Sequence, residues 1–153
     1  MSKKKSPIFD QTDIDFINQK SAYIFEDLEK IEKVLKDFSY EELITNGLYK
    51  DATERWLERV ITRILDINFY LLRKLKGKTP KTYRESFAEM VAQNIITQEL
   101  CEQVQPCAGA RNTLVHEYDH LDSIKFYKSL QNTIKLFPKY IKAVSDFVEK
   151  HKK

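Results

Sequence analysis

Hydrophobic residues recur every three or four positions through most of the chain, which is the spacing of one face of an α-helix. The first such stretch runs from Asp10 to about Lys36, and glutamate and lysine fill its other faces. Its apolar positions are Ile14, Ile17, Tyr23 or Ile24, Leu28, Ile31 and Leu35. This pattern predicts a long amphipathic helix that packs its apolar face against other helices.

A second helix is predicted from about Asp51 to Lys76, and its apolar face is broader. The face comprises Leu57, Ile61, Ile64, Leu65, Leu71, Leu72 and Leu75, widened by Trp56, Val60 and Ile67. Such a width is typical of a helix that contacts several neighbours, in a bundle or at a subunit interface. Between the two long helices, Ser39 and Glu42 match a capping box for a short helical turn that Gly47 ends.

The second half of the chain predicts three more helices. The sequence GKTPKT at residues 77–82 breaks the second long helix. Thr82 and Glu85 then cap a shorter helix, a fourth helix begins near Thr97, and Asp122 caps the last one.

Turn-forming residues are scarce, with three glycines and four prolines in the whole chain. This scarcity argues against a β-sandwich or barrel, which needs many turns. Pro106 and Pro138 fall inside the fourth and last helices, where proline kinks a helix or removes one hydrogen bond. We therefore predict an all-α fold, a single-domain antiparallel bundle of about five helices over residues 10–150, with a flexible basic tail at residues 1–9.

Composition narrows the class of protein further. Of 153 residues, 42% are hydrophobic and 32% charged, which is too apolar for a disordered chain and too charged for a membrane protein. The net charge of +3 does not by itself indicate a nucleic-acid binder, but it leaves room for a local basic site. No apolar run predicts a signal peptide or a membrane span. Cys101 and Cys107 lie about 120° apart on a helix, so we expect free thiols, as in a reducing cytoplasm.

One local pattern suggests metal chemistry. Residues 116–120 read His-Glu-Tyr-Asp-His, which matches the H-E-x-x-H arrangement of zinc peptidases. On a helix, His116 and His120 would share a face and Glu117 would act as general base. However, no strand is predicted to hold a peptide, and no residue is selected as a third ligand.

A second pattern combines Arg111 with His116. Arg111 falls on the same helical stripe as Val104 and Cys107, and a charge on an apolar face needs either a buried carboxylate partner or a cleft. His116 lies five residues further on, about 140° around a regular helix. The two side chains would converge if the helix ended between them, or if a twofold dimer brought two copies together.

The longer string RNTLVHEYDHLD, residues 111–122, resembles the HepT-like branch of the HEPN family. The family hallmark is an arginine followed by a polar residue and, a few positions later, His-x-Tyr; here these are Arg111, Asn112, His116 and Tyr118. The resemblance also covers ERWLERVITRILDINFYLL in the second helix and TPKTYRESFAEMVAQNIIT before the fourth, and spans about Asp13 to Tyr127.

This resemblance implies a HEPN-like helical domain with the activity of a metal-independent ribonuclease toxin, without a cofactor. Members form homodimers in which two Arg–His pairs face each other across a cleft, and they are encoded beside a minimal nucleotidyltransferase antitoxin, MntA. It implies that His116 and Arg111 are catalytic toward RNA. Asn112 would orient a phosphate or the histidine, or cap the helix end.

The resemblance also implies a modification site. In related systems the antitoxin transfers AMP from ATP to the tyrosine of His-x-Tyr, which is Tyr118 here. The alternative is a purely structural role, in which the Tyr118 ring is half-buried and its hydroxyl is bonded to the backbone. Two other functions stay open. One is a non-catalytic HEPN partner that presents a substrate or nucleotide to a nucleotidyltransferase. The less favoured one is a zinc hydrolase using His116, Glu117 and His120, because the family varies at the last of these positions.

Overall fold

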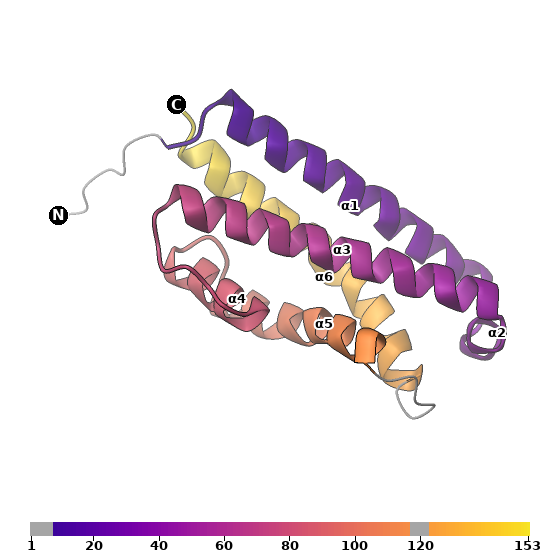
Figure 1. Ribbon diagram of the computed structural model, residues 1–153. Coiled ribbons are helices and arrows are strands. Elements are labelled where there is room, and N and C mark those ends of the chain that lie inside the picture. Colours follow the sequence, from indigo (N-terminus) through magenta and orange to yellow (C-terminus); the bar gives the residue numbers. More distant parts are fainter. Residues whose placement is uncertain (1–7, 117–122) are drawn as a thin grey trace.

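The computed structural model describes residues 8–116 and 123–153, and for residues 110–116 it describes the backbone alone. Over these residues the chain forms helices joined by short connections, without a β-strand (Figure 1). The helices are α1 (Gln11–Asp37), α2 (Tyr40–Thr45), α3 (Gly47–Lys74), α4 (Tyr83–Ala92), α5 (Gln98–His116) and α6 (Ser123–Lys150). The predicted all-α class is confirmed.

The helices are arranged around α3. Helices α1 and α3 run antiparallel side by side, and α6 lies behind them (Figure 1). On the other side of α3, the short α4 packs against both α3 and α5, and α5 in turn contacts α6. The broad apolar face predicted for the second long helix is therefore used by contacts with α1, α2, α4 and α5.

The two ends of the described chain lie next to each other (Figure 1). The backbone N–H groups of Ile8 and Phe9 donate to the carbonyl of His151, at 2.7 and 3.0 Å. The Phe9 ring is fully buried and meets the edge of Phe147 in α6. Residues 8 and 9, which the sequence placed in the basic tail, are thus packed onto the end of the bundle.

Side-chain caps set most of the helix starts. Asp10 forms a capping box with Asp13 at the start of α1, and Ser39 forms the predicted one with Glu42 at the start of α2. Thr82 caps α4 by accepting from the backbone N–H of Glu85 at 3.1 Å. The predicted cap at Asp122 lies outside the described residues.

The structure differs from the prediction between α2 and α3. The capped turn after α1 is a complete helix of six residues, which makes six helices in the described chain rather than about five. Gly47 does not end α2; it begins α3, some four residues before the predicted start at Asp51. The reason is Asn46, whose side chain accepts from the N–H of Tyr49 and so caps the new helix directly.

The interior is apolar except at a few paired positions. The largest fully buried side chains come from every layer of the bundle: Phe9, Ile24, Ile31, Leu43, Leu57, Ile61, Ile64, Ile67, Leu71, Phe87, Phe137 and Tyr140. Each such side chain stabilises the fold by about 1.5–3 kcal/mol relative to exposure. Helices α5 and α6 continue through Pro106 and Pro138.

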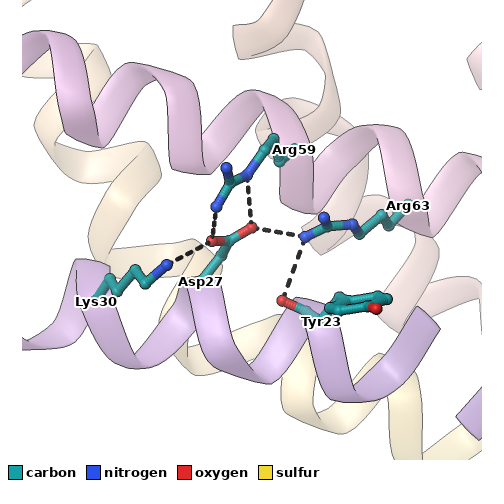
Figure 2. Close-up of polar contacts among 5 residues, drawn as sticks. All are labelled: Tyr23, Asp27, Lys30, Arg59 and Arg63. Atoms are coloured by element: carbon teal, nitrogen blue, oxygen red, sulfur yellow. Dashed lines mark hydrogen bonds and ion pairs between the residues drawn. The ribbon is translucent and has the colours of Figure 1, made fainter. Parts of the chain in front are cut away.

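A buried carboxylate joins α1 to α3 (Figure 2). Asp27, only 1% exposed, accepts from Arg59 through two nitrogens, Nε at 3.0 Å and Nη2, and from Nη1 of Arg63 at 2.7 Å. The Lys30 ammonium lies 3.8 Å away. Arg63 also covers the Tyr23 ring, with 5.0 Å between its guanidinium carbon and the ring centroid. The carboxylate is therefore surrounded by positive charge.

A second buried carboxylate, Asp13, lies in the first turn of α1, against the last turns of α3. It accepts from the Tyr70 hydroxyl, from Lys74 at 3.1 Å and from the backbone of Asp10 at 3.0 Å. Burial alone would raise the pKa of Asp13, but these hydrogen bonds and the lysine charge lower it to about 2. Burial and the neighbouring carboxylate raise the pKa of Tyr70 to about 12.

A buried polar group also fixes α4. The Asn68 amide in α3 donates to the Ser86 hydroxyl at 3.2 Å and accepts from the Tyr140 hydroxyl of α6. Ser86 in turn donates to the backbone carbonyl of Tyr83 at 2.7 Å. Since a buried polar group left without a partner is costly, this chain of bonds specifies where the first turn of α4 sits.

Asp27→Asn replaces a carboxylate with an amide whose N–H groups oppose the two arginines. We expect a loss of about 1–3 kcal/mol in the free energy of unfolding, measured by urea denaturation. Asp146→Asn removes an exposed carboxylate paired only with Lys142 and should change stability by less than about 0.5 kcal/mol. Equal effects of the two substitutions would show that Asp27 does not hold the helices together.

The low pKa of Asp13 predicts a specific acid sensitivity. Because the folded value of about 2 is below the ordinary 3.8, the unfolded chain takes up the proton first as pH falls. The contribution is complete above about pH 4 and is lost between about pH 4 and pH 2. Asp13→Asn should therefore be less stable at neutral pH and lose less stability over this acid range, in urea unfolding. Stability curves parallel to those of the native protein would contradict this assignment.

Candidate functional site

The Arg–His motif lies in the last turns of α5. This helix continues without interruption to His116, so it does not end between Arg111 and His116. Their backbone positions are therefore about 140° apart around the axis and about 7.5 Å apart along it. The unbroken helix therefore excludes one of the two geometries in which the side chains could converge, namely a helix end between the two residues. Convergence through a second copy of the chain is the way that stays open.

The predicted site residues divide into two groups. Arg111, Asn112 and His116 belong to α5, where the structure describes their backbone. Tyr118 lies outside the described residues, as do Glu117 and His120 of the zinc alternative. Within residues 8–109 and 123–153, no group of three histidine, cysteine or acidic side chains is placed to hold a metal ion.

The preceding turns of α5 anchor the motif to the bundle. Cys101, Val104, Cys107 and Ala108 are buried, and Arg111 follows Cys107 by four residues, one turn further along this row. Both thiols are free, as predicted. Burial raises the pKa of Cys107, and burial likewise raises that of Cys101, so neither is a reactive thiolate.

A cationic side chain outside the motif lies beside the same helix. The Tyr83 hydroxyl approaches α5 at Gly109, where a Cβ atom would come within 3.2 Å of it. Arg84 donates through Nε to that hydroxyl at 3.1 Å, and this bond raises the pKa of the guanidinium further. The sequence showed Tyr83–Phe87 only as part of a family resemblance. The signal that could have singled out Arg84 is the run of basic residues that precedes it.

No described helix is both long and apolar enough to cross a membrane.

Comparison with family models matches residues 24–144 to the family described as "Ribonuclease HepT-like". Two relatives differ in the RNA they are named for. A "tRNA nuclease HepT" of Aphanizomenon flos-aquae is 30% identical over 76% of this chain and 79% of its own length. An "mRNA nuclease HepT" of Shewanella oneidensis is 26% identical over 85% of this chain and 96% of its own.

Solved structures agree with this match. A tri-AMPylated HEPN toxin of Shewanella oneidensis, in complex with its MNT antitoxin, is 26% identical with a TM-score of 0.78, and covers 86% of this chain and 98% of that one. A cytosolic protein of unknown function from Bacillus subtilis shares the fold at 16% identity and a TM-score of 0.74, over 87% and 88% of the two chains. The all-helical arrangement of Figure 1 is thus a fold that this family uses.

Proposed function

The chain belongs to the HepT-like ribonuclease family, and we propose that it is a metal-independent endoribonuclease whose catalytic residues are Arg111 and His116. The observation that carries this proposal is the position of the Arg-x4-His motif on an unbroken helix that is anchored by its earlier turns. The proposal places the active site at a cleft between two copies of the chain, since one helix alone holds the two residues about 140° apart.

Each residue has a physical role in RNA cleavage. The imidazole of His116 would accept the proton of a ribose 2′-hydroxyl, since histidine is a common general base, and the freed oxygen would attack the adjacent phosphorus. The guanidinium of Arg111 binds two phosphate oxygens and stabilises the charge that builds up on them. In a twofold dimer the second His116 would protonate the leaving oxygen. Asn112, one residue after the arginine, would orient the phosphate or the imidazole.

We further propose that the protein is the toxin of a toxin–antitoxin pair. The support is the Shewanella oneidensis relative, which is AMPylated and bound to an MNT antitoxin. In this chain the acceptor would be Tyr118, two residues after His116: its oxygen would attack the α-phosphorus of ATP and release pyrophosphate. The added phosphate would place negative charge and bulk where RNA phosphate must bind.

Arg111→Ala and His116→Ala should each lower the rate of RNA cleavage at least about 100-fold, with EDTA present, while the helical circular-dichroism spectrum stays unchanged. His151→Ala removes a histidine near the other end of the bundle and is the matched control. Intact mass must be measured first, because a modified tyrosine would hide the activity.

Full activity in both motif variants would contradict the site assignment. Activity that needs zinc, one per chain, would instead favour the H-E-x-x-H hydrolase. If unmodified native protein cleaves no RNA in a broad panel but binds nucleotide tightly, the chain is a non-catalytic partner of a nucleotidyltransferase.

Tyr118→Phe should keep RNA cleavage within about threefold of native and resist silencing by the partner nucleotidyltransferase with ATP, because no phenol oxygen is left to accept AMP. Mass spectrometry of the native chain after the same incubation should show additions of AMP. Native protein that is silenced without any gain in mass would refute this mechanism of control.

A further inference from the structure

The segment that leads into α4 is strongly basic. Residues 76–84 contain Lys76, Lys78, Lys81 and Arg84 and no acidic residue. All four side chains are exposed, and none forms an ion pair with another described side chain. A chain of net charge +3 thus places four cations that form no described ion pair within nine residues, which favours a local positive field.

Within this segment, the guanidinium of Arg84 is oriented by contacts with the adjacent tyrosine. Its Nε donates to the Tyr83 hydroxyl, and its guanidinium carbon lies 5.8 Å from the Tyr83 ring centroid. Tyr83 is itself held, since its ring packs against the core and its carbonyl accepts from buried Ser86. The two terminal nitrogens of Arg84 have no partner among the described residues, so they are available to an anion.

The contact at Gly109 sets where this arginine lies relative to the motif. His116 follows Gly109 by seven residues, which is nearly two full helical turns: about 20° around the axis and about 10 Å along it. The Tyr83–Arg84 pair therefore lies against the same face of α5 that carries His116, two turns before it. Arg111, about 200° from Gly109, belongs to the opposite side of the helix.

We propose that Arg84 binds a backbone phosphate of the RNA that flanks the scissile one, and that Tyr83 is its positioning residue. The inference rests on the proposed ribonuclease function and extends it from the cleaved bond to the neighbouring nucleotides. The planar fork of an arginine suits two phosphate oxygens, and a hydrogen bond to Nε leaves both terminal nitrogens free for them. Glycine at position 109 allows the Tyr83 hydroxyl to approach the helix closely enough to hold this geometry.

The other cluster of arginines in the molecule does not compete for this role. Arg59 and Arg63 are committed to the Asp27 carboxylate (Figure 2). Their charges hold α1 to α3, whereas Arg84 forms no ion pair with a described acidic side chain; the neighbouring Glu85 accepts instead from the backbone N–H of Lys81 at 2.6 Å.

The test is direct binding of a short single-stranded oligoribonucleotide with 2′-O-methyl groups, which lacks the attacking hydroxyl and is not cleaved by the proposed mechanism. Binding is measured by fluorescence anisotropy over a series of salt concentrations, with EDTA. Arg84→Ala should weaken binding about three- to tenfold and lower the slope of log K against log salt by about 0.7, the value for one phosphate contact on a single strand. Arg84→Lys should restore the slope and only part of the affinity.

Two further variants test whether the position of Arg84 matters apart from its charge, and whether the loss of any exposed arginine has the same effect. Tyr83→Phe keeps the charge and removes the hydroxyl, so it should weaken binding two- to threefold and raise KM with kcat unchanged, as expected for about one lost hydrogen bond. Arg73→Ala removes an exposed arginine in the last turn of α3, at the opposite end of the bundle from the end of α5, and should leave affinity and slope as in the native chain (Figure 1).

The outcomes distinguish this inference from the ribonuclease proposal. If Arg84→Ala and Arg73→Ala behave alike, or if the native chain does not bind the oligoribonucleotide, the role of Arg84 is refuted whatever the cleavage assay shows. If Arg84→Ala weakens binding but native, unmodified protein cleaves no RNA, the phosphate contact is supported and the ribonuclease proposal fails. If Arg84→Ala weakens binding and the motif variants lose RNA cleavage, with unchanged helical circular-dichroism spectra, both the phosphate contact and the ribonuclease proposal are supported.

Discussion

The buried carboxylate of Asp27, held between two arginines one turn apart on α3, is the constraint on which the arrangement depends (Figure 2). Carboxylates are rarely buried unless their charge is paired, and a lone apolar stripe would let α1 slide along α3. Asp13 at the start of α1 and Asp27 near its middle both pair with α3, and so fix its register. Once α1 is placed, α3 presents its other faces to α4 and to α5, the helix that carries the motif.

Much of this arrangement is readable from the sequence, because helical periodicity and caps are local signals. Spacings of three and four predicted the long helices, and Ser39 and Thr82 marked two of the starts. The error at Gly47 has a local cause as well: glycine is a common end signal, but the preceding Asn46 caps a new helix. The partners of Asp27 could not be predicted, since Arg59 and Arg63 lie more than thirty residues away in sequence.

For the site, the sequence indicated which residues to consider and the backbone indicated how they relate. The sequence of residues 111–118 identified Arg111 and His116 as candidates. Their spacing was compatible with two geometries, a helix end between them or a twofold dimer. The unbroken helix removes one of them. The contact between Tyr83 and Gly109 joins residues 26 positions apart, so it needed the packing of α4 on α5 to become visible. That packing depends in turn on the buried bonds of Asn68 and Ser86.

The placement of charge connects the fold to the proposed chemistry. The cations of α3 are neutralised where they face buried carboxylates, so they contribute to stability and add little to the outward field. The cations of residues 76–84 have no such partners, and one of them, Arg84, is hydrogen-bonded to a tyrosine that contacts α5. A polyanion that approaches this chain would be attracted to these cations, of which Arg84 lies beside the helix face of His116. The proposed binding surface beside the motif then depends on the charges that the fold leaves unpaired. The net charge of the chain does not show where those charges lie.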